Sequence, residues 1–178
     1  MKVNKRIIVS GRYIVLVVLL FMSIGKVKSQ QSVTAQVFAE VIEALAANED
    51  EALNFGRFTP GNNGGAITVT PLGLCTIEGT VVLTGGSYSP GHFLVSGAPG
   101  TSFTIRLPDN PSVLVHRQSG KTMQVEEWIS DPPPGGDAVT LPDGSRSISI
   151  GATIIVGPLD ENPVGLYAGT YLLTFAYN

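Results

Sequence analysis

The side chains best suited to acid–base catalysis in this sequence are two histidines, His92 and His116. A hydrolase also needs a nucleophile beside such a base, and residues 85–89 (GGSYS) lack the G-x-S-x-G spacing of a nucleophile elbow. His116 alternates away from Val113 and Val115, so we expect it on the polar face of a strand. The sequence therefore predicts a protein that is not an enzyme.

The acidic residues and the cysteine also lack the spacing of a known site. Glu126 and Glu127 are neighbours in an expected strand, so they would project from opposite faces and could not act as a catalytic pair. The acidic stretches 48–51 and 160–162 are expected to be solvated loops without the spacing of a calcium loop. Cys75 is the only cysteine, which excludes an internal disulfide. We expect no metal and no cofactor.

Two features are candidate contact sites for a glycan or a protein. Trp128 falls on the same strand face as Glu126, where an exposed aromatic ring would serve binding, although packing between sheets explains it equally well. Pro132, Pro133 and Pro134 form a run with no backbone donors, which predicts an exposed loop.

The first 29 residues have the layout of a secretory signal: basic residues are followed by an apolar run over 13–24, too short to span a bilayer. We expect cleavage before Gln30 and a single β-sandwich domain over 30–178. Cleavage would leave five basic and fourteen acidic side chains, a formal charge of −9. Such a surface disfavours nucleic acid, and the membrane would be met only through the export signal. We expect a secreted protein of the periplasm, cell surface or medium.

Short apolar runs rich in Val, Ile, Thr, Phe and Tyr alternate with Gly- and Pro-containing turns throughout the remaining chain. This rhythm is typical of an all-β sandwich or barrel and leaves no room for crossover helices. The expected strands cover residues 67–70, 81–83, 93–96, 102–107, 113–117, 123–129, 147–156 and 170–177.

Two segments are candidates for pairing with another chain. Val33, Val37 and Val41 lie in a stretch, 33–47, that fits a helix by its i, i+4 spacing and a strand by its alternation with alanines. The C-terminal run 170–177 is apolar on both faces, with Tyr171 and Phe175 on one of them, so we expect it to be central or covered by a partner.

Several short landmarks occur in a characteristic order along the chain. They are residues 34–37 (TAQV), 53–56 (LNFG), 67–71 (ITVTP), 93–100 (FLVSGAPG), 104–108 (TIRLP), 121–125 (KTMQV), 150–154 (IGATI) and 165–171 (GLYAGTY). Together they resemble the bacterial domain-of-unknown-function family 4402 over nearly the whole expected mature chain. The resemblance implies an exported immunoglobulin-like Greek-key β-sandwich, distantly similar to spore-coat and fimbrial subunits, and favours a strand over 33–47. It implies no known activity or site residue.

Three classes of function follow from these observations. The first is a structural or adhesive surface subunit that pairs strands with copies of itself or with related subunits. The second is a monomeric module that binds a glycan or a host protein, and an enzyme is the third.

Overall fold

The computed structural model describes residues 31–135 and 138–178, and every regular element in these ranges is a β-strand, which confirms an all-β protein. The expected signal peptide lies outside the described residues. The strands are β1 (Ala46–Glu51), β2 (Arg57–Thr59), β3 (Gly65–Val69), β4 (Cys75–Gly79), β5 (Val82–Gly85), β6 (Gly91–Ser96), β7 (Ser102–Arg106), β8 (Ser112–His116), β9 (Thr122–Asp131), β10 (Val139–Thr140), β11 (Ser145–Val156), β12 (Tyr167–Ala168) and β13 (Thr174–Tyr177). Among the described residues no helix could cross a membrane.

Val41–Asn178 forms one compact unit, and residues 31–40 belong to a separate one. Residues 31–45 have no regular secondary structure, so the expectation of a strand over 33–47 is wrong except for its last two residues, which begin β1. Alternation alone does not make a strand, because its backbone groups need a neighbouring strand to pair with.

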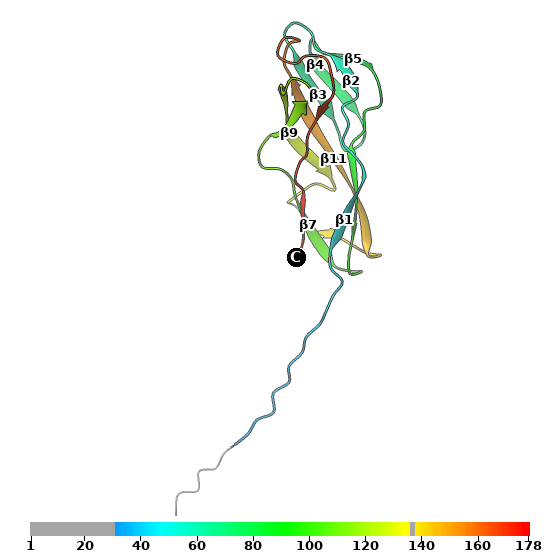
Figure 1. Cartoon of the computed structure of the whole chain (residues 1–178). Coiled ribbons are helices and arrows are strands. Elements are labelled where there is room, and N and C mark those ends of the chain that lie inside the picture. Colours follow the sequence, from blue (N-terminus) through cyan, green and yellow to red (C-terminus); the bar gives the residue numbers. More distant parts are fainter. Residues whose placement is uncertain (1–30, 136–137) are drawn as a thin grey trace, which may run out of the picture. The chain divides into compact units, whose positions relative to one another are not determined.

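One large sheet is organised around β11, which runs through the compact unit (Figure 1). The first half of β11 pairs with β6 and its second half with β3, while β9 pairs along the opposite edge. Gly151 lies where β6 gives way to β3, and a Cβ atom there would come within 2.3 Å of the Val69 carbonyl oxygen. The sheet order is β1-β6-β11-β9-β8-β12, with β3 and β4 as a side branch.

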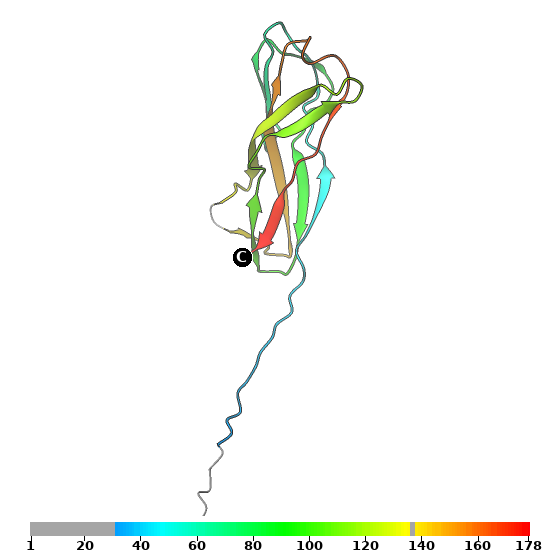
Figure 2. The same ribbon diagram turned by 60° about the vertical axis from the view of Figure 1, so that its left-hand side comes forward.

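Two small sheets cover different parts of the large one. The sheet β10-β7-β13 contributes to one buried cluster, and we call this the β7 cluster; its members are Val95, Phe103, Ile105, Val139, Leu141, Ile148 and Ile150. The pair β2-β5 lies near the opposite end of the unit from β13 (Figures 1 and 2). It covers the second cluster, called the β3 cluster, which consists of Phe55, Ile67, Val69, Val81, Met123, Val125, Ala152, Ile154 and Val156.

A bulge in β9 decides which side chains join these clusters. Glu127 has a φ of 53°, and the pairing of β9 with β11 shifts register around it. Met123 and Val125 are buried before the bulge, whereas Trp128 and Ser130 face inward after it. The expectation that Trp128 lies on a polar face is therefore wrong, because a bulge reverses the alternation that the sequence pattern assumes.

In β8, too, the buried face is the opposite of the expected one. Val113 and Val115 are each 44% exposed, whereas Leu114 packs against the β3 cluster and His116 is buried. The expectation of a solvated His116 is wrong, because both of its ring nitrogens have hydrogen-bonding partners inside the fold, which makes the burial of a polar ring tolerable.

Each of the eight expected strands overlaps an observed one, β1 was expected only at residues 46–47, and β2, β4, β10 and β12 were not expected. The stretch 48–51, expected to be a loop, belongs to β1, where pairing with β6 overrides its acidic composition. The expected strand 170–177 is shorter, since residues 170–173 have no strand pairing. The immunoglobulin-like Greek-key arrangement stays a prediction.

Candidate functional site: an open seam

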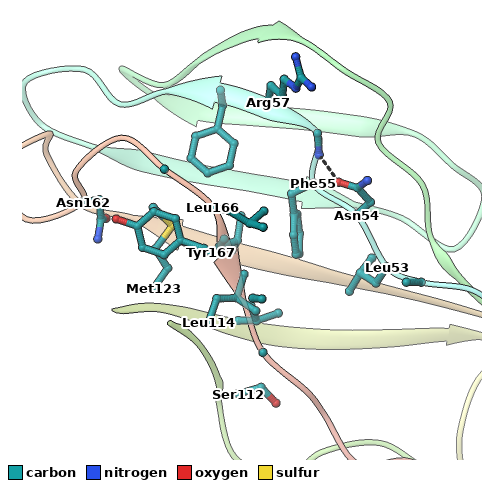
Figure 3. Close-up of a pocket in the computed structure, with 18 of the residues that line it drawn as sticks. Leu53, Asn54, Phe55, Arg57, Ser112, Leu114, Met123, Asn162, Leu166 and Tyr167 are labelled. Atoms are coloured by element: carbon teal, nitrogen blue, oxygen red, sulfur yellow. Dashed lines mark hydrogen bonds between the residues drawn. The ribbon is translucent and has the colours of Figure 1, made fainter. Parts of the chain in front are cut away.

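A cavity of about 700 Å³ lies beside the small sheet β2-β5. Residues 52–60 line one side of it and residues 162–171 the other, with β8 and β9 beneath. Figure 3 shows the side chains of Phe55, Leu166 and Tyr167 approaching one another above Leu114 and Met123. Most side chains that line this cavity are apolar, which is typical of sites that hold an apolar group.

A second cavity of about 490 Å³ continues the first. Both are lined by Ala52, Leu53, Gly169, Thr170 and Tyr171, and the second one extends to β1 and to Phe175 of β13. We call this continuous groove the seam: residues 47–60 form its first wall and residues 162–175 its second. The seam therefore separates the beginning of the compact unit from its end.

No strand pairing joins the two walls of the seam within the described residues. Among the strands that the structure describes, β1 pairs only with β6 and β2 only with β5, while β13 pairs only with β7. Residues 170–173 form no backbone hydrogen bond in the described structure. Both walls therefore carry backbone groups that are free to pair with an added strand.

The floor of the seam is apolar and its rim exposes large side chains. Met123, Val125 and Ile154 are buried beneath it. On the second wall, Val164 is 79% exposed and Leu166 is 58% exposed. Such a rim keeps apolar side chains in contact with water, which is unfavourable unless something covers them.

The two cavities meet beside an aromatic pair. The rings of Trp128 and Tyr171 stack at 4.6 Å between centroids, and Phe93 meets Tyr171 edge-on. Trp128 packs against both the β3 and the β7 clusters, which assigns it to packing between the layers. The indole Nε1 and the phenol oxygen of Tyr171 are buried without a hydrogen-bond partner. Each such group costs about 1–3 kcal/mol, so these two polar atoms reduce the stability of the junction.

Burial also changes the acidity of this tyrosine. It raises the pKa of Tyr171 to about 12, and the negative charge of Glu49 adds to the effect. The phenol is therefore neutral at physiological pH and lines the seam as an uncharged group.

His116 holds the second wall in place. Its Nε2 donates to the carbonyl oxygen of Val164 at 3.1 Å, which leaves Nδ1 to accept from the Ser119 backbone N–H at 3.0 Å. The ring also packs on Tyr167, 4.9 Å away. With both nitrogens engaged and only 3% of the residue exposed, His116 is a structural residue of the rim.

His92 lies on a different surface. Its Nδ1 is 3.0 Å from the Ser149 hydroxyl and its Nε2 is 3.9 Å from a carboxylate oxygen of Glu51, in the order of a serine–histidine–acid triad. The three come from adjacent strands of the large sheet, and none of them lines either cavity. A hydrolase also needs a substrate pocket beside its nucleophile, and neither of the two cavities supplies one here.

The remaining candidates have structural surroundings. Cys75 packs against the β3 cluster, and burial raises the pKa of its thiol. Asn162 is buried and donates to the Thr122 carbonyl at 3.1 Å, so the acidic turn 160–162 is fastened to the sheet. Pro133 and Pro134 are exposed, as expected, and Pro132 is partly buried. No cluster of three metal-binding side chains occurs among the residues placed by the structure.

Comparison with known proteins identifies a family whose function is unknown. The chain matches no curated protein and no solved structure. The family described as a domain of unknown function (DUF4402) matches residues 45–177, which cover the strands, both buried clusters and the seam. The chain therefore belongs to the DUF4402 family.

Proposed function

We propose that this protein is an exported, non-enzymatic structural or adhesive subunit of the cell surface, which associates with copies of itself or with related subunits by strand pairing. The observation that carries the proposal is the state of residues 33–41. Val33, Val37 and Val41 are between 83% and 97% exposed and have no pairing partner in the described structure. A segment that alternates in this way and stays uncovered is suited to being donated to another sheet.

The export part of the proposal rests on the layout of residues 1–29 as a secretory signal. The non-enzymatic part is supported by the surroundings of the two histidines: His116 is engaged at the rim of the seam, and His92 lies outside both cavities. A strand-pairing function needs neither a catalytic group nor a cofactor.

The test is the mass of the chain from Gln30 onward, measured by light scattering after size exclusion over a range of concentrations, with reductant to remove any dimer through Cys75. We expect reductant-insensitive oligomers. Replacing Val33, Val37 and Val41 together by serine should return the chain to a monomer, since the donated face would lose its apolar side chains.

A matched control changes the other face of the same segment. Replacing Thr34, Gln36 and Glu40 together by serine alters three exposed residues and keeps all three valines, so oligomers should persist. A wild-type monomer at every concentration would contradict the proposal. That result would favour the monomeric binding module, with the exposed Pro133 and Pro134 as the first residues to change in a screen against glycans and host proteins.

A further inference from the structure

We infer that the seam is the acceptor site for residues 33–41 of a second copy of this chain. This inference rests on the proposed function and specifies its partner and its binding site. The donated segment would lie as an additional strand between the first wall, residues 47–60, and the second wall, residues 162–175.

The side-chain pattern of the segment fits the seam. In an extended chain Val33, Ala35, Val37, Ala39 and Val41 share one face. The floor of the seam is also apolar, so this face would exchange water for apolar surface on docking. The segment has one charged residue, Glu40, which lies on the opposite face and would remain in water.

The length of the segment also fits. Nine residues in a strand span about 30 Å, at about 3.3 Å per residue. The second wall lines the two joined cavities from Val164 to Phe175, twelve residues against the nine of the segment. A donated strand would therefore cover the exposed side chains of Val164, Leu166 and Leu172 along the rim.

The backbone of the seam is prepared for pairing. The unpaired residues 170–173 on one wall and the outer edge of β2 on the other would each meet the donated strand. This arrangement differs from the free edge of β4, where the preceding turn exposes Leu72 and Leu74 but neither of the two cavities receives a side chain. A groove with apolar floor and open edges binds a strand by main-chain pairing and by side-chain insertion together.

A second copy is a better source than the same chain. The carbonyl of Glu43 accepts a hydrogen bond from the Tyr177 hydroxyl at 2.9 Å, and Leu45 packs against the β7 cluster. The chain is thus fixed immediately after the segment and continues directly into β1. For the same chain to fill its own seam, it would have to turn back within residues 42–44, where Tyr177 already holds the carbonyl of Glu43.

The experiment is a crosslinking map between two preparations of the chain from Gln30, both with Cys75→Ser. One carries Val37→Cys and the other carries Leu166→Cys on the rim of the seam, and the two are distinguished by tag length. After mixing and mild oxidation, we expect about tenfold more heterodimer than with a control partner carrying Leu94→Cys, because docking raises the local concentration of the thiols. Leu94 is 39% exposed on the large sheet and lines neither cavity.

The outcomes separate this inference from the proposed function. A further partner keeps the native Cys75 on β4 and carries no introduced cysteine. If oligomers form but Val37→Cys links preferentially to this partner, strand donation stands and the seam is the wrong acceptor. If a single chain carrying both Val37→Cys and Leu166→Cys closes on itself at high dilution, the second copy is the wrong donor. If no oligomer forms, the proposed function fails together with the inference.

Discussion

The two ends of the compact unit differ in how completely their apolar clusters are covered. Around the β7 cluster, a three-stranded sheet lies over the large sheet, and Phe103, Ile148 and Leu141 are completely buried. Around the β3 cluster the cover is only the pair β2-β5, and Phe58, Leu114 and Tyr167 remain partly exposed beside a large cavity. The β7 cluster is thus covered more completely by its own chain than the β3 cluster, and a third strand over the large sheet makes the difference.

The largest effect should come from matched phenylalanines at the two ends. Phe103→Ala removes a fully buried ring and should lower the free energy of unfolding by about 3–5 kcal/mol. Phe58→Ala removes a partly exposed ring at the seam and should cost only about 1 kcal/mol in the monomer. Denaturant unfolding of the two variants measures both, and equal costs would break the distinction between the ends.

A second comparison uses the two histidines. His116→Ala removes the hydrogen bonds to Val164 and Ser119 and should lower the free energy of unfolding by about 2 kcal/mol, with faster amide exchange in residues 164–167. His92→Ala changes a partly exposed residue on the large sheet and should stay within about 0.5 kcal/mol of wild type. Unchanged exchange over residues 164–167 in the first variant would show that His116 does not hold the rim.

The smallest effect concerns two tyrosine hydroxyls. Tyr171→Phe removes a buried hydroxyl without a partner and should be neutral or stabilise the fold by up to about 1 kcal/mol. Tyr177→Phe removes the donor to Glu43 and the acceptor for the Ala98 N–H, and should destabilise by about 1 kcal/mol. Thermal unfolding at neutral pH distinguishes them. A loss of stability in Tyr171→Phe would show that the buried hydroxyl stabilises the fold.

The same tyrosine predicts a dependence on alkaline pH. Because the pKa of Tyr171 is raised by burial from about 10 to about 12, the folded state disfavours the phenolate. The stability that the protonated phenol contributes is fully present below pH 10 and is lost as the pH rises toward 12. Between pH 10 and 12, the free energy of unfolding should therefore fall less steeply with pH for Tyr171→Phe than for wild type. Identical slopes would show that the phenol ionises without opposing the fold.

Much of the fold was predictable because alternation and turn residues act locally. The strand over Phe103 and Ile105 was expected with the correct buried face, and glycine-rich turns separated the expected strands correctly. The candidate site was less predictable. The seam is lined by residues 47–60 and 162–175, which are distant in sequence, and its only local signals were the two-sided apolar run at the C-terminus and the apolar segment near the N-terminus.

The failures have specific physical causes. A single bulge at Glu127 reversed the face of Trp128, and no local pattern distinguishes a bulged strand from a regular one. His116 was assigned to the wrong face because its burial depends on a carbonyl 48 residues away, at Val164. Residues 33–45 were expected to form a strand, yet in the described structure they have no strand pairing.

The sequence by itself determined the all-β class, the position of most strands and the alternating apolar face of residues 33–41, since these follow from side-chain order along an extended backbone. Only the tertiary structure decided which side chains share a core and where the seam lies. Both depend on strand register and on pairing between distant segments, which free energies of burial and backbone hydrogen bonding select together.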